Sequence, residues 1–157
     1  MTREYLTKAG REQIEGELRK LLSEERPRII RALAAARAHG DLKENAEFHS
    51  AREKQGMIEA RISYLKSVVA RSEVVDVASQ SGTVKFGATV QLEDDDTGEE
   101  VTYQLVGEAE SDLRRGKLNW RTAFAAALIG KDVGDMVCVK APAGERFFTV
   151  IDIRYIA

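Results

Sequence analysis

The sequence is poor in cysteine and in net charge, and it has no long hydrophobic run. Its 157 residues contain one cysteine, Cys138, which excludes an internal disulfide framework, and we interpret this thiol as a small buried residue of a strand. The formal net charge of −2 argues against a strongly basic nucleic-acid-binding protein. No stretch approaches the roughly 20 apolar residues of a membrane-spanning helix, and the N-terminus lacks the apolar centre of a signal peptide. We therefore expect a cytoplasmic protein without a membrane partner.

In the first half of the chain, apolar residues recur with the period of an α-helix. The two stripes comprise Ile14, Leu18, Leu21, Leu22, Ile29, Leu33 and Ala36, and then Phe48, Ala51, Gln55, Ile58, Ile62, Leu65 and Val69. The second stripe alternates spacings of three and four residues, the heptad pattern of packed helices. The stripes match as an antiparallel hairpin that folds back near Leu42, with Ala36 opposite Phe48 and Leu33 opposite Ala51. This predicts a helical arm of about 30 residues and about 45 Å.

Thr7 is the predicted N-cap of the first helix, and two later residues interrupt that helix. Glu25 occupies a position of the apolar stripe, and Pro27 falls inside the helix. Proline lacks an N–H, and its ring clashes with the preceding turn. We therefore expect Pro27 to kink the helix or to loosen one turn.

The second half of the chain changes to the alternation of β-strands. We expect strands at residues 84–92, 101–106, 136–140 and 146–155, and one short helix at 123–129 that Thr122 caps and Gly130 ends. These elements form a small antiparallel sheet with one helix. The predicted fold class is α+β, with an antiparallel coiled-coil hairpin over residues 1–76 and a sheet domain over residues 77–157.

Two carboxylates lie at the predicted fold-back. Asp41 and Glu44 have the spacing of a capping box, in which Asp41 caps the second helix and Glu44 accepts the N–H of the cap residue. Leu42 lies between them at an exposed tip, which favours a function beside capping. Hard carboxylate oxygens suit Mg²⁺, which takes one or two protein carboxylates and keeps several waters. Since two carboxylates do not hold Mg²⁺ tightly, the rest of its shell would come from a partner.

Imidazoles and basic residues surround the same fold-back. His39 and His49 flank it, but without the compact ligand spacing of a structural zinc site, so we interpret them as solvated side chains. The basic residues near the tip are Arg37, Lys43, Arg52 and Lys54. They fit either a solvated helical face with i,i+4 pairing to glutamates or a patch that contacts phosphates.

Other motifs give no self-contained catalytic set. Residues 94–98 resemble a calcium-binding loop, but the glycine comes one place early and the closing glutamate is absent, which favours a hairpin turn. Gly130 and Lys131 lack the upstream glycine of a P-loop. No nucleophile lies beside a base. We therefore do not expect an enzyme in its own right.

The run GDLKENAEFHSAREKQG, residues 40–56, closely resembles the GreA/GreB family of bacterial transcript-cleavage factors. The resemblance continues in RPRII at 26–30, FGATV at 86–90 and ALIGK at 127–131. It implies an N-terminal coiled coil and a C-terminal domain similar to FKBP-type folds, which docks at the rim of the secondary channel of RNA polymerase. The coiled coil would enter the channel and bring its acidic tip to the active centre of a backtracked complex, where the polymerase cuts its own transcript.

The family motif assigns roles to individual residues. Asp41 and Glu44 match the catalytic acids, which would share Mg²⁺ with the polymerase active centre and orient the attacking water, and the chain alone would bind no cofactor. We assign contacts with the 3′ segment of the nascent RNA to Arg37, Lys43 and Arg52, and we expect a monomer.

Docking on the polymerase is assigned to Thr122, Phe124 and Gly130. They lie in a run that the family usually writes S-P-(L/I)-A-R-A-L-I-G and that reads TAFAAALIG here. The proline and the arginine of that run are lost, which leaves room for a channel-binding inhibitor that does not promote cleavage. A prolyl isomerase, by analogy to the FKBP-type domain, is the third hypothesis.

Overall fold

The computed structural model describes residues 4–40 and 45–156. Contacts group these residues into two units: residues 12–40 and 45–71 form one, which we call the arm, and residues 4–11 and 72–156 form the other, which we call the sheet unit. The grouping adds the N-terminal residues to the sheet unit, and the predicted division between residues 76 and 77 stays a prediction. None of the helices in the described ranges is long and apolar enough to cross a membrane.

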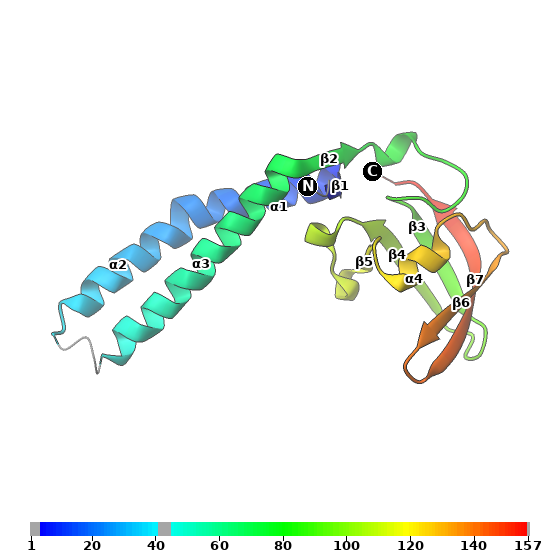
Figure 1. The fold of residues 1–157 in the computed structure, drawn as a ribbon. Coiled ribbons are helices and arrows are strands. Elements are labelled where there is room, and N and C mark those ends of the chain that lie inside the picture. The colour runs from blue at the N-terminus through cyan, green and yellow to red at the C-terminus, as the bar shows by residue number, and fades with distance from the viewer. Residues whose placement is uncertain (1–3, 41–44, 157) are drawn as a thin grey trace. The chain divides into compact units, whose positions relative to one another are not determined.

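The arm is a helical hairpin (Figure 1). Its elements are α1 (Lys8–Lys20, whose first turn belongs to the sheet unit), the π-helical turn η1 (Leu21–Glu25), α2 (Arg26–Arg37) and the returning α3 (Ala46–Arg71). A buried cluster joins α2 to α3 and consists of Ile29, Leu33, Ala36, Phe48 and Ala51, with Ile58 packed against it. These contacts confirm the predicted antiparallel hairpin.

Pro27 has the predicted effect on the first helix. It lies in the first turn of α2, directly after η1, where the N–H of Arg26 bonds to the carbonyl of Leu21, five residues earlier. The wider π-helical turn accommodates the ring of a proline and its missing N–H. At the other end of α3, Val68 is fully buried whereas the predicted Val69 is half-buried, because an α-helix drifts away from a strict heptad repeat.

The sheet unit contains a two-stranded and a five-stranded sheet. The strands are β1 (Glu4–Thr7), β2 (Ser72–Val75), β3 (Thr89–Asp94), β4 (Glu100–Val106), β5 (Lys117–Asn119), β6 (Met136–Ala141) and β7 (Gly144–Arg154). Strands β1 and β2 pair in parallel, and the larger sheet has the order β5-β4-β3-β7-β6, in which only β4 and β5 are parallel. The α+β class is confirmed, and each parallel pairing includes a strand that the sequence did not predict: β1 and β2 in the smaller sheet, and β5 beside β4 in the larger one.

Short helical segments complete the sheet unit. They are the 3₁₀ turns η2 (Val77–Ser79), η3 (Glu108–Glu110) and η4 (Leu113–Arg115), and the α-helix α4 (Ala123–Leu128). The core between the larger sheet and α4 consists of Val84, Ala88, Val90, Leu92, Leu105, Leu118, Ala125, Leu128, Val137, Phe148 and Val150. The predicted helix at residues 123–129 is thus confirmed.

Two local predictions are corrected. Strand β3 begins at Thr89 rather than at Val84, because Gly87 turns the chain with φ +89° and donates its N–H to the carbonyl of Leu105 at 2.8 Å. Cys138 lies on β6 but its side chain is exposed, so the prediction of a buried thiol is wrong. The alternation of the run was correct, but Val137 and not Cys138 faces the core.

Candidate functional site

The candidate site is the connection between α2 and α3. Helix α2 ends at Arg37 and α3 begins at Ala46, so a short segment joins two antiparallel helices (Figure 1). Asp41, Lys43 and Glu44 belong to this segment and lie outside the described residues. The described residues on either side show how the protein holds the two ends of the segment.

Asn45 links the two helices at this point. Its side-chain oxygen accepts the N–H of Phe48 at 3.1 Å, which is the N-cap interaction of α3. Its side-chain amide donates to the carbonyl of Ala36 in the last turn of α2 at 2.7 Å. One side chain thus satisfies an end group of each helix. Helix α3 therefore begins at Ala46 with Asn45 as its cap, and the predicted capping box of Asp41 and Glu44 lies outside the described residues.

An aromatic side chain closes the end of the hairpin. Phe48 is 6 % exposed and Ala36 is 4 % exposed, so the last apolar layer of the arm lies directly before the connecting segment. The guanidinium of Arg37 lies over the Phe48 ring, 5.7 Å from its centroid, a cation–π contact. This contact holds the positive charge of Arg37 near the segment that carries Asp41 and Glu44.

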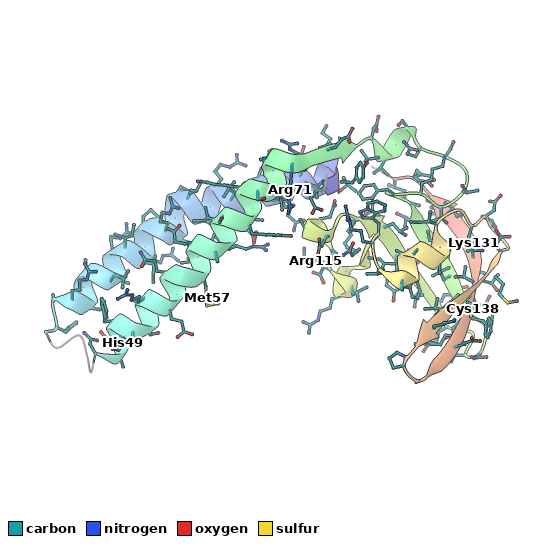
Figure 2. All side chains as sticks on the ribbon, in the orientation of Figure 1. His49, Met57, Arg71, Arg115, Lys131 and Cys138 are labelled. Atoms are coloured by element: carbon teal, nitrogen blue, oxygen red, sulfur yellow. The ribbon has the colours of Figure 1, made fainter. Side chains whose placement is uncertain are left out.

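Charged side chains are exposed around the same end. Nε2 of His39 lies 3.9 Å from the carboxylate of Glu47, and the Arg52 and Lys54 side chains are exposed on α3. Figure 2 shows His49 in the first turns of α3, near this end of the arm. Within residues 4–40 and 45–156, no group of three or more His, Cys, Asp or Glu side chains could hold a metal ion.

Two bidentate ion pairs join the helices of the arm. Arg26 donates to both carboxylate oxygens of Glu59 at 2.8 Å, and these hydrogen bonds lower the pKa of Glu59. Arg61 donates to Glu17 at 2.9 to 3.2 Å. Exposed ion pairs add little to stability, but bidentate geometry fixes how two helices register against each other.

The predicted docking residues have clear structural roles. Thr122 caps α4, since its hydroxyl accepts the N–H of Ala125 at 3.3 Å and donates to the carbonyl of Asn119 at 2.8 Å. Phe124 is half-buried, with its ring 5.7 Å from that of Tyr103 and 5.5 Å from that of Phe148.

Two other positions of the run 122–130 are exposed on the surface of the sheet unit. Gly130 is exposed at the end of α4, with φ +86°. Ala126 is exposed as well and stands where the family usually has arginine. That replacement therefore changes the surface of the sheet unit and leaves its core unchanged.

Sequence reasoning missed Asn45 as a functional residue. Asparagine is among the preferred N-cap residues, and Asn45 stands three positions before the first apolar residue of the seam, which was a usable signal. Its second role, the bond to Ala36, had none, because it depends on how α2 ends.

Both halves of the chain match family models. The model described as "Transcription elongation factor, N-terminal" matches residues 4–74, and "Transcription elongation factor, GreA/GreB, C-term" matches residues 79–155. Two curated relatives named "Transcription elongation factor GreA" come from Paracoccus denitrificans, 54 % identical over 96 % of this chain and 97 % of that protein, and from Thioalkalivibrio sulfidiphilus, 49 % identical over 99 % and 100 %. These names agree with the resemblance of residues 40–56 to the GreA/GreB family.

Solved structures give a weaker likeness. The crystal structure of GreA factor homolog 1 of Thermus thermophilus is 28 % identical, with a TM-score of 0.46 over 98 % of this chain and 99 % of that chain. The elongation factor GreA/GreB from Nitrosomonas europaea is 20 % identical, with a TM-score of 0.43 over 98 % and 100 %. The matches of both halves to the family models, together with relatives about half identical along nearly the whole length, show that this chain belongs to the GreA/GreB family of transcription elongation factors.

Proposed function

We propose that the protein stimulates RNA polymerase to cleave its own transcript in backtracked complexes, and that Asp41 and Glu44 are the residues it contributes. The observation that carries the proposal is the fold-back of the arm: α2 ends at Arg37 and α3 begins at Ala46, so the two acids belong to the segment that joins antiparallel helices. In this proposal the arm enters the secondary channel of the polymerase and reaches the 3′ end of the nascent RNA.

The two acids have the chemistry that phosphodiester hydrolysis needs. Their oxygens suit Mg²⁺, which takes one or two protein carboxylates, so Asp41 and Glu44 would hold the ion together with ligands of the polymerase. The bound ion would stabilise negative charge on the phosphate during hydrolysis. A carboxylate of this pair would also accept a hydrogen bond from the attacking water and orient it. The protein by itself would bind no cofactor and would not be an enzyme.

The end of the arm supports delivery of these acids. Asn45 bonds to both helices, and Phe48 fills the last apolar layer, so the two ends of the connecting segment are held. A reactive group must be placed to within about 1 Å, because larger errors cost orders of magnitude in rate. Asn45 and Phe48, which would not touch the reacting groups, would therefore affect the cleavage rate by placing the two acids.

Basic residues at the same end favour a contact with RNA. We propose that Arg37, Lys43 and Arg52 contact phosphates of the displaced 3′ segment. Arg37 and Arg52 are exposed on α2 and α3. Phosphate contacts position a nucleic acid without reading its sequence, which suits a factor that acts wherever the polymerase has backtracked.

We propose that the sheet unit docks on the polymerase through the surface at the end of α4. Gly130 would contact the partner directly, whereas Thr122 and Phe124 would support the surface by holding α4 on the core. The exposed Ala126 leaves this surface without the arginine of the family motif. We further propose that the protein acts as a monomer in the cytoplasm, without a membrane partner.

The test adds the full-length protein to stalled, backtracked elongation complexes. Shortened transcripts that the polymerase can extend again are the expected result. If transcripts stay intact while the protein still competes for the channel, it acts as a channel-binding inhibitor and the proposal fails. A peptide prolyl-isomerisation assay on the same preparation tests the isomerase hypothesis, and we expect no activity.

A further inference from the structure

The first turn of α1 has an N-terminal cap that its own sequence does not complete. The hydroxyl of Thr7 accepts the N–H of Gly10 at 3.0 Å, so Thr7 is the cap residue and Gly10 is the third residue of the helix. In a capping box that third residue is glutamate or glutamine, whose side chain accepts the N–H of the cap residue. Glycine has no side chain that could do this.

A glutamate from the sheet supplies the missing group. Glu110, the last residue of η3, accepts the N–H of Thr7 at 2.8 Å and also accepts a hydrogen bond from the Thr7 hydroxyl. The same carboxylate accepts the N–H of Gly107 at 3.2 Å. The capping box of α1 is therefore completed by a residue 103 positions away in the sequence. One carboxylate thus joins η3 to the first turn of α1.

Gly10 provides the space for this carboxylate. A Cβ atom at Gly10 would lie 2.1 Å from Oε1 of Glu110 and 2.4 Å from its Cδ, closer than any van der Waals contact. Glycine inside a helix costs about 1 kcal/mol relative to alanine, so the helix has a residue that is poor for its own stability. The close approach of Glu110 accounts for that choice.

A second glycine brings η3 and β1 together. A Cβ atom at Gly107 would lie 1.9 Å from the backbone oxygen of Tyr5, so η3 and β1 touch at the level of the backbone. Glu110 is half-buried in this contact. Every residue of this joint, from Tyr5 to Gly10 and from Gly107 to Glu110, belongs to the sheet unit, and α1 continues from it as one helix to Lys20.

We propose that Glu110 is a positioning residue for the cleavage reaction, because its carboxylate caps α1 from the sheet unit and anchors the root of the arm there. The proposal rests on the proposed function, in which the far end of the arm carries the chemistry. About 30 helical residues span about 45 Å, so a rotation of about 5° at the root moves the far end by about 4 Å. A displacement of that size is large compared with the tolerance of a reactive geometry.

The first test compares Glu110→Ala with Glu108→Ala in the full-length protein. Glu108 lies on the same η3 turn, and its side chain is exposed, so its variant removes a carboxylate without removing the cap. We expect Glu110→Ala to lower the cleavage rate at saturating factor by at least about 10-fold, with competition for polymerase unchanged and Glu108→Ala like wild type. If Glu110→Ala weakens competition as much as it slows cleavage, Glu110 serves docking and the proposal is overturned.

A second pair of variants separates positioning from helix stability. Gly10→Glu combined with Glu110→Ala moves the carboxylate into α1, so a local capping box stabilises the helix but no longer joins it to η3. We expect this double variant to regain thermal stability relative to Glu110→Ala while cleavage stays low. Recovery of cleavage together with stability would show that Glu110 only stabilises α1, and it would refute the positioning role.

A measurement without polymerase tests the anchor independently of the proposed function. Met57 on α3 and Cys138 on β6 are both exposed (Figure 2), so Met57→Cys allows spin labels on the arm and on the sheet unit. We expect a broader distance distribution when Glu110→Ala is added and an unchanged one when Glu108→Ala is added. Equal widths in all three proteins would refute the anchor, whereas a failure of wild type to stimulate cleavage with a broadened Glu110→Ala distribution would refute only the proposed function.

Discussion

Replacing Asn45 by alanine should loosen the end of the arm that carries the two acids. The substitution removes an acceptor from the N–H of Phe48, 3.1 Å away, and a donor from the carbonyl of Ala36, 2.7 Å away. The first change uncaps α3, and the second separates the end of α2 from the beginning of α3. The buried apolar layer of Ala36 and Phe48 remains, so the loss is confined to the polar contacts.

The size of the effect follows from these two contacts. Loss of an N-cap side chain costs about 1 kcal/mol, and loss of one further hydrogen bond costs about 1 kcal/mol. The sum of about 2 kcal/mol corresponds to a change of about 30-fold in the equilibrium for local opening. Asp41→Ala should not have this effect, because Asn45 and not Asp41 caps α3.

Hydrogen exchange of single amides measures this opening. In Asn45→Ala the amide of Phe48 should exchange about 30-fold faster than in wild type, while the amide of Ile62, in the buried middle of α3, should keep its rate. Asn45→Asp is the matched control, since aspartate still caps the helix but cannot donate to Ala36, and exchange at Phe48 should be only about 5-fold faster than in wild type, as the loss of about 1 kcal/mol requires. Unchanged exchange at Phe48 in Asn45→Ala would refute the assignment of Asn45 as the link.

Three further predictions concern other parts of the chain. Replacing Arg37 and Arg52 together by alanine should slow cleavage and flatten its salt dependence, because phosphate contacts are screened; an unchanged salt response would mark a solvated face. Gly107→Ala should destabilise the protein to urea by about 2 kcal/mol, because the added Cβ meets a backbone oxygen of β1 at 1.9 Å, whereas Gly56→Ala, with no atom within 4 Å, should not. Burial raises the pKa of Glu110 above its ordinary value, although the hydrogen bonds that it accepts lower it. The free energy of unfolding should therefore fall as pH rises from about 4, the pKa of a glutamate in the unfolded chain, through the raised pKa in the folded protein. Glu110→Gln should abolish this pH-dependent part of the free energy of unfolding.

Features with a local period could be predicted from the sequence. The seam that places Ala36 opposite Phe48 depends on a repeat within each helix, and the structure has the same cluster. Thr122 at the beginning of α4 follows a preference of single residues for cap positions. Both signals lie within a few residues of the structure that they predict, so no knowledge of the rest of the fold was needed.

Features that join distant segments could not be predicted in this way. Strand β1 has four residues and pairs in parallel with β2, with Glu4 opposite Ser72, and so short a strand has no measurable alternation. Near α1, the sequence indicates the cap from Glu110 only indirectly, because position 10 has glycine where a capping box has glutamate or glutamine. Asn45 shows both cases, since its cap role was readable from its residue type but its bond to α2 depends on the hairpin itself.

The rate of transcript cleavage at saturating factor tests the central claim most directly. Backtracked elongation complexes would receive wild type, Asp41→Asn, Glu44→Gln, or the control Glu47→Gln, which neutralises an exposed carboxylate in the first turn of α3. Asp41→Asn and Glu44→Gln should each lower the rate by at least about 100-fold while competing for polymerase as well as wild type, and Glu47→Gln should cleave normally. Cleavage at the wild-type rate by both tip variants would contradict the account.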